Sequence, residues 1–233
     1  MTERDVERTI GRIAALADPV RRTLYQYVAG SAGEVSRDQA ARAARIARPL
    51  AAFHLDKLVE QGLLDASYRR LTTRRGPGAG RPAKLYRRSA LQLDVSLPAR
   101  DYELAARLFA GVLAGSPPAT LARVRHAARA LGRALGREAR TGAGARAGRP
   151  TLLRHLAAVL RRQGYEPFRA PDRAIRLRNC PFDVLARDHR PLVCGMNHAL
   201  LDGVVRGLGV AGCRAVLDPQ PGGCCVALRT GMR

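Results

Sequence analysis

Helix-start and helix-stop signals in residues 1–90 constrain the fold more than any other feature of this 233-residue chain. Asp18 precedes Pro19, which places an N-cap before a proline at the first helical position. The run Ser36-Arg-Asp-Gln39 is a capping box and opens another helix. Apolar residues recur every three or four positions around these signals. The stretch therefore predicts four helices, the last over about 48–61.

Two strands are expected after these helices, at residues 63–71 and 83–88. Residues 72–82 between them are too rich in glycine and proline for regular structure. A sharp turn through residues 45–47 separates the third helix from the fourth. Three helices, a turn, a further helix and a glycine-rich hairpin together predict a winged helix-turn-helix.

The rest of the chain predicts a separate part that mixes helices and strands. Residues 99–139 have helical periodicity, and residues 141–150 have the composition of a flexible linker. Two helices, each followed by a hairpin, are then expected at 151–163, 165–178, 192–207 and 213–229. The expected fold class is α+β. Its domains are a winged helix-turn-helix (1–95), a helical dimerisation region with a linker (96–150) and a small cysteine-bearing α+β domain (151–233).

The net charge of +22 favours a polyanion such as nucleic acid as the partner. However, 39 of the 41 basic residues are arginines in an alanine-rich chain, a bias typical of a GC-rich genome. The placement of the charges is therefore better evidence than their number. No apolar stretch approaches the ~18 residues of a membrane span, and the first residues do not resemble a signal peptide. We expect a cytoplasmic protein.

The fourth helix is expected to read the major groove of DNA, as the second helix of a helix-turn-helix does. Its inward stripe is Ala51, Leu55 and Leu58. The residues that point outward are then Arg48, Pro49, Ala52, Phe53 and Lys57. Arg48 can pair with guanine, while Ala52 and Phe53 can touch thymine methyl groups. Alternatively, Phe53 packs on a neighbouring helix.

The predicted wing is basic throughout, with eight basic residues and no acidic one from Arg69 to Arg88. Arg81, between Gly80 and Pro82, suits a narrow A·T minor groove. Arg74 and Arg75 are expected to contact phosphates, which position a protein without reading sequence. The alternative is a solvated basic loop with no binding role.

All five cysteines lie in the last 54 residues. Three of them, Cys180, Cys194 and Cys224, have the spacing C-x13-C-x29-C, which is unlike the paired knuckles of a zinc ribbon. Three thiolates from separate elements suit an iron–sulfur cluster, and the spacing does not distinguish [4Fe-4S] from [2Fe-2S]. We expect the dipole at a helix N-terminus to favour the Cys194 thiolate. Inert burial of the three thiols is the alternative.

A fourth ligand is less evident from the sequence, and three residues are candidates. Cys213 lies on a predicted strand and can also be a small core residue. Cys225 directly follows Cys224, so in a strand it would point to the opposite face. His198 lies four residues after Cys194, on the same face of a helix, and can also be a surface or capping histidine.

Three segments carry a resemblance to a known family: residues 17–30 (ADPVRRTLYQYVAG), 50–64 (LAAFHLDKLVEQGLL) and 78–88 (GAGRPAKLYRR). They resemble the ArsR-like winged-helix regulators of actinobacteria, and with the C-terminal cysteines the chain is similar to the SufR branch of that group. The resemblance covers most of the chain, least so residues 99–149. Arg45 and Ala47 depart from it, because a glycine and a serine cap are expected at these positions.

The resemblance implies a homodimeric, nucleoid-associated bacterial transcription factor, usually a repressor, that binds a double-stranded DNA operator. It also implies a [4Fe-4S] cluster on Cys180, Cys194 and Cys224. An enzyme is not expected, because Cys194 and His198 have no evident orienting acid and no phosphate loop is present. Neither a membrane nor a small-molecule substrate is expected as a partner. The alternatives are zinc or redox thiols in place of the cluster, or an architectural DNA-binding protein that senses nothing.

Overall fold

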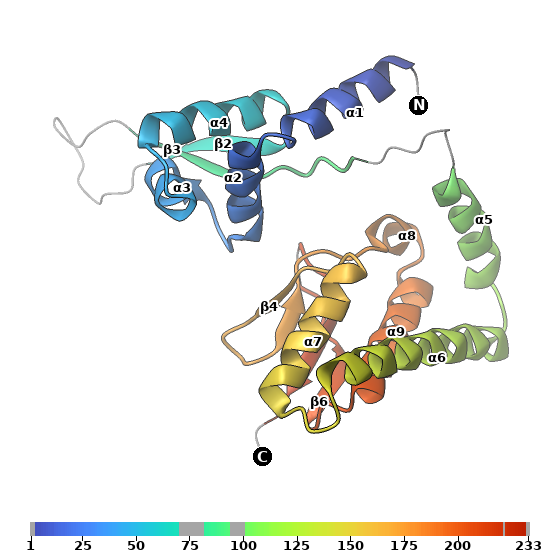
Figure 1. The fold of residues 1–233 in the computed structure, drawn as a ribbon. Helices are drawn as coiled ribbons and strands as arrows, with labels where there is room; N and C mark the ends of the chain where they lie inside the picture. Colours follow the sequence, from blue (N-terminus) through green and yellow to red (C-terminus); the bar gives the residue numbers. More distant parts are fainter. Residues whose placement is uncertain (1–2, 70–81, 94–100, 221, 232–233) are drawn as a thin grey trace. The chain divides into compact units, whose positions relative to one another are not determined.

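The computed structural model describes residues 3–69, 82–93, 101–220 and 222–231, and it divides into two compact units. Unit 1 comprises residues 1–100 and unit 2 residues 101–233. Figure 1 shows the elements of each unit. The predicted α+β class, with an N-terminal helix-turn-helix and a C-terminal part that bears strands and cysteines, is confirmed.

Unit 1 is a winged helix-turn-helix. Its elements are α1 (Glu3–Ala15), α2 (Pro19–Gly30), β1 (Val35–Ser36), α3 (Arg37–Ala44), α4 (Arg48–Glu60), β2 (Leu64–Arg69) and β3 (Ala83–Arg88). The three strands form an antiparallel sheet in the order β1-β3-β2. The two-residue strand β1 is an element that the sequence pattern did not predict.

The predicted helix signals have the geometry expected of them. The Asp18 carboxylate accepts a hydrogen bond from the Arg21 amide at 2.8 Å, and Ser36 and Gln39 form both bonds of the capping box. The turn before α4 is less favourable. Arg45 has a left-handed backbone with φ 54°, a conformation that suits glycine, and Ala47 makes no side-chain cap.

Unit 2 joins both predicted hairpins into one sheet. Its helices are α5 (Tyr102–Ala114), α6 (Pro118–Ala143), α7 (Arg149–Arg162), α8 (Asp183–Asp188) and α9 (Arg190–Leu208). Its strands are β4 (Pro167–Arg169), β5 (Ile175–Leu177), β6 (Cys213–Leu217) and β7 (Val226–Thr230). The antiparallel order is β4-β5-β7-β6, so the inner strands of the two hairpins pair with each other.

Helices α6 and α9 lie side by side and make backbone contact through glycines (Figure 1). A Cβ on Gly132 would lie 2.0 Å from the Leu200 carbonyl oxygen, and one on Gly203 would lie 2.3 Å from the Arg129 carbonyl oxygen. Gly136 and Gly207, one turn further along each helix, are equally close to the partner's backbone. No side chain larger than hydrogen fits at these four positions.

This packing differs from the predicted domain division at residue 150. Helix α6 belongs to unit 2, and only residues 144–148 separate it from α7, where the sequence predicted a linker over 141–150. The reason is that an i, i+4 glycine pair lets two helix backbones approach closely, and hydrophobic periodicity does not show this. No helix in the described part of the chain is long and apolar enough to cross a lipid bilayer.

Candidate functional site

Helix α4 places the predicted DNA-reading residues on its outer face. Ala51, Leu55 and Leu58 are fully buried, as the periodicity predicts, and anchor the helix in the core of unit 1. Phe53 is 57% exposed, so it does not pack on a neighbouring helix, and its ring centroid lies 5.3 Å from that of His54 in a T-shaped arrangement. Leu50, on the same helix, is also exposed, and exposed apolar side chains that lie together suggest a contact with a partner.

The other predicted contacts of α4 are also accessible. Arg48 and Pro49 are exposed, while Ala52 and Lys57 are half-buried. Arg48 pairs with Asp38 at 2.7 Å, and Lys57 pairs with Glu60 at 2.7 Å. Exposed ion pairs of this kind contribute little to stability, so DNA phosphates or bases can displace the carboxylates at small cost.

A polar cluster around Asp56 joins α4 to the wing strand β3, and sequence reasoning missed it. The Asp56 carboxylate accepts hydrogen bonds from Lys84 at 2.8 Å, from the Tyr86 hydroxyl at 2.7 Å and from Arg37 at 3.0 Å. Burial alone would raise the pKa of Asp56, but the bonds from Lys84 and Tyr86 outweigh it and hold that pKa below its ordinary value. The sequence signal that could have indicated this cluster is Asp56 itself, an acidic residue among apolar and basic neighbours in the predicted DNA-reading helix.

The wing is less uniformly basic in three dimensions than in sequence. Among its described basic residues, Arg69 pairs with Glu34 at 3.3 Å, Lys84 with Asp56 at 2.8 Å and Arg87 with Asp65 at 3.3 Å. The predicted DNA contacts Arg74, Arg75 and Arg81 lie outside the described residues. The wing strands thus use part of their charge to hold the fold of unit 1.

Four of the five cysteines gather in unit 2, from three segments of the chain. Cys180 lies between β5 and α8, Cys194 lies in α9, and Cys224 and Cys225 precede β7. The Cys194 and Cys225 sulfurs are 2.8 Å apart, and Cys180 and Cys224 are joined by a hydrogen bond between their thiols. Within the described ranges, however, no three His, Cys, Asp or Glu side chains are arranged to hold a metal ion.

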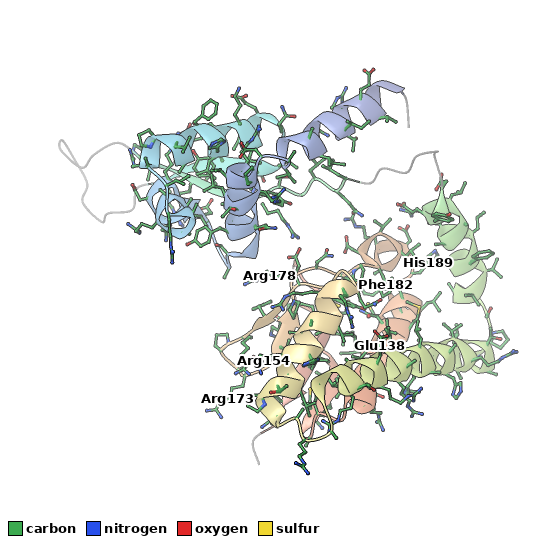
Figure 2. The ribbon with its side chains drawn as sticks, in the orientation of Figure 1. Glu138, Arg154, Arg173, Arg178, Phe182 and His189 are labelled. Atoms are coloured by element: carbon green, nitrogen blue, oxygen red, sulfur yellow. The ribbon has the colours of Figure 1, made fainter. Side chains whose placement is uncertain are left out.

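The buried amide of Asn197 organises the Cys180–Cys224 pair. Its Nδ2 donates to the Cys224 sulfur at 3.3 Å and lies 4.0 Å from the Cys180 sulfur. The Tyr165 hydroxyl donates to Asn197 Oδ1 at 2.5 Å, which fixes the direction of the amide. The ring of Phe182, labelled in Figure 2, packs edge-on against Tyr165. Asn197 was not predicted, although its position three residues after Cys194 places it near the same helix face.

These contacts give the thiols different acidities. The hydrogen bond from Cys180 lowers the pKa of Cys224 to about 7 against the effect of burial, and bonds from Val226 and Asn197 add to this. The same bond and burial raise the pKa of Cys180. Burial and the contact with Cys225 raise the pKa of Cys194 to about 12. The predicted favouring of the Cys194 thiolate is therefore wrong, because Cys194 lies beyond the first turn of α9, where the dipole is weak.

The remaining candidates for a fourth ligand lie apart from this group. Cys213, on β6, packs against the main core of unit 2, where burial raises its pKa to about 11. His198 Nε2 lies 3.1 Å from the Ala215 carbonyl oxygen of the same strand. Of the three candidates, the structure brings only Cys225 to the other cysteines.

Comparison with known proteins identifies the N-terminal part of the chain. Residues 16–65, from the end of α1 to the start of β2, match a family model described as a helix-turn-helix domain. Comparisons with curated proteins and with solved structures gave no match. The helix-turn-helix match and the geometry of unit 1 together support a DNA-binding transcription regulator of the winged helix-turn-helix type.

Proposed function

We propose that this regulator is a dimeric repressor whose C-terminal cysteines hold an iron–sulfur cluster as its signal. The proposed ligands are Cys180, Cys194 and Cys224, with Cys225 as the fourth. The observation that supports this most strongly is the gathering of four thiols from three separate segments beside one buried amide. Cysteines that merely fill a core have no reason to collect in this way.

The donor set suits such a cluster. Only sulfur ligands lie in the group, and soft thiolates are what iron–sulfur clusters require. Asn197 supplies an N–H donor beside two of the sulfurs, and such hydrogen bonds tune clusters. Two thiolates that share one iron, as in a [2Fe-2S] cluster, are about 3.8 Å apart for a metal–sulfur bond of ~2.3 Å, and thiolates on separate irons of a [4Fe-4S] cluster are further apart. Cys194 and Cys225, at 2.8 Å, would have to separate when they ligate.

Helix α5 supports the proposed dimer. Five large apolar residues of this helix are exposed: Tyr102, Leu104, Leu108, Phe109 and Val112. Val112 is 77% exposed and Tyr102 is 76% exposed, which is unusual for apolar residues of a helix. Because the glycine face of α6 already packs against α9, we assign the contact with a second copy to the exposed apolar face of α5.

The dimer can be tested by light scattering. Phe109→Glu should convert the dimer to a monomer, because it places a charge within the apolar face. Leu217→Glu, at an exposed apolar residue of β6, is the matched control and should leave the dimer intact. A Phe109→Glu protein that remains dimeric would remove α5 from the proposal.

The cluster can be tested by an absorption spectrum of protein purified without oxygen, with assays of iron and acid-labile sulfide. We expect a brown protein with a broad band near ~400 nm, as is usual for cysteine-bound clusters. Cys224→Ala should abolish the band, and Cys213→Ala should retain it. A colourless protein that contains zinc, or that takes up neither iron nor sulfide, would overturn the cluster.

A non-sensing architectural role is tested by the salt dependence of DNA binding. A regulator retains preference for its operator at moderate salt, whereas nonspecific binding weakens uniformly on all sequences. Equal affinity for all duplexes at about 0.15 M salt would favour the architectural role.

A further inference from the structure

We propose that Cys194 and Cys225 form a reversible disulfide in the cluster-free protein. The two sulfurs lie 2.8 Å apart, although their residues are 31 positions apart in the chain. A disulfide bond is ~2.05 Å long, so the sulfurs need to approach by less than ~1 Å. The disulfide itself does not depend on the proposed function, whereas its effect on cluster loading rests on that function.

Both thiols are held in place by their surroundings. Cys194 belongs to α9, and its side chain packs in a small apolar cluster with Ala186 and Val193, closed by Phe182. The backbone carbonyl of Cys225 accepts a hydrogen bond from the Asp218 amide at 2.8 Å. Because each backbone is fixed and no side chain separates the sulfurs, little conformational entropy is lost when the bond closes.

The Cys180–Cys224 pair is less suited to this reaction. The Cys224 sulfur already accepts hydrogen bonds from the Asn197 amide at 3.3 Å and from the Val226 N–H at 3.5 Å. These bonds stabilise a separate sulfur and are weakened if it joins a disulfide. The Cys225 sulfur instead accepts a hydrogen bond from the Cys194 thiol itself, its partner in the proposed disulfide.

The exposure of the two thiols sets the order of the chemistry. Cys225 is partly exposed and Cys194 is buried, so a small disulfide such as glutathione disulfide meets Cys225 first. The Cys225 thiolate attacks one sulfur of the small disulfide, forms a mixed disulfide and releases one small thiol. The Cys194 sulfur then attacks the Cys225 sulfur and releases the second small thiol. Two protein thiols are oxidised, one small disulfide is reduced to two thiols, and the two protons leave with these products.

The disulfide would exclude the cluster, because it consumes two of its four proposed ligands. Oxidised protein should then take up iron and sulfide only after the disulfide has been reduced. The unit would thus have three states: cluster-loaded, reduced without a cluster, and oxidised.

The test treats the cluster-free full-length protein with glutathione disulfide under anaerobic conditions. Free thiols are then alkylated in denaturant and counted by mass spectrometry. The number of free thiols should fall from five to three, and peptide mapping should identify a disulfide between Cys194 and Cys225. In the matched control Cys213→Ser, the number of free thiols should fall from four to two. In Cys225→Ser all four thiols should remain free. Circular dichroism verifies that both variants are folded.

Five remaining thiols, a stable mixed disulfide on Cys225, or a bond between Cys180 and Cys224 would each overturn the inference. Its failure is distinguishable from failure of the proposed function, since the thiol count requires no iron. A disulfide in a protein that never takes up a cluster would sustain the inference and refute the cluster. A cluster that loads equally into oxidised and reduced protein would refute the exclusion.

Discussion

Both units of this protein bury an apolar core, but their helices pack in different ways. Unit 1 buries side chains such as Leu24, Leu55 and Leu58, which lie at helical spacing and are bounded by capping signals. Unit 2 also buries a core, with side chains such as Leu156 and Leu208, but it packs α6 against α9 through glycines such as Gly132 and Gly203. Local signals in the sequence therefore define the DNA-reading unit, whereas contacts between distant residues define the cysteine-bearing unit.

The largest expected effect breaks the glycine packing of unit 2. Gly203→Ala places a Cβ 2.3 Å from the Arg129 carbonyl oxygen, which forces the two helices apart. We expect a loss of about 3 kcal/mol in the free energy of unfolding. Gly195→Ala, on the same helix, has its nearest neighbour at 3.8 Å and is the control. Hydrogen exchange should locate the loss in residues 101–233, and equal protection in the two variants would contradict the glycine contact.

A smaller effect is expected at the polar cluster of unit 1. Asp56→Asn weakens the bonds from Lys84 and Arg37, and we expect a cost of roughly 1–2 kcal/mol, measured by thermal unfolding. Because the folded pKa of Asp56 is lowered, its contribution is present above the ordinary value of ~4 and is lost as the pH falls through the folded pKa. The free energy of unfolding of Asp56→Asn should therefore fall less on acidification than that of the unaltered protein.

The control for this variant is Asp38→Asn, which removes an exposed pair with Arg48 and should cost less than ~0.5 kcal/mol. Equal losses for the two variants would show that the Asp56 cluster contributes no more than a surface ion pair.

The outer face of α4 is tested by Phe53→Ala. Because Phe53 is exposed, we expect no change in unfolding but roughly tenfold weaker binding, which is about 1.4 kcal/mol, to a duplex selected from a random-sequence pool. Leu217→Ala, another exposed apolar residue but in unit 2, should leave binding unchanged. Unaltered affinity in Phe53→Ala would exclude this ring from the DNA contact.

The smallest effect compares the same substitution in both units. Arg45 and Arg173 have left-handed backbones, with φ 54° and 63°. Replacing either residue with glycine should raise the free energy of unfolding by up to about 1 kcal/mol, because a left-handed backbone strains the Cβ of arginine. Arg42→Gly, in the last turn of α3, should instead cost about 1 kcal/mol. Destabilisation by Arg45→Gly would show that its side chain contributes contacts that outweigh the strain.

The contrast explains how much of the fold could be predicted. The Asp18 cap, the Ser36 capping box and the buried stripe of α4 are all encoded within a few residues, and their predictions hold. The role of α6 could not be predicted in the same way, because a glycine face is significant only when its partner helix is known. The two glycine pairs, each at i, i+4 spacing, were visible in the sequence, but their partnership was not.

In the candidate site, too, local features could be predicted from the sequence and contacts between distant residues could not. The exposure of Phe53 follows from the period of one helix, whereas the pairing of Cys194 with Cys225 depends on how a hairpin meets α9. Sequence spacing identified the cysteines but not Asn197, whose buried amide orients toward two of them. It also placed His198 beside Cys194, although the structure directs its ring to β6.

We propose that the state of the cysteines in unit 2 controls DNA binding by unit 1. Fluorescence anisotropy with the selected duplex tests this by comparing cluster-loaded protein with protein from which iron has been removed and whose thiols are kept reduced. We expect dissociation constants that differ by roughly tenfold or more, an ordinary allosteric coupling. The difference should vanish in Cys224→Ala. Equal affinity of the loaded and cluster-free proteins would contradict the account.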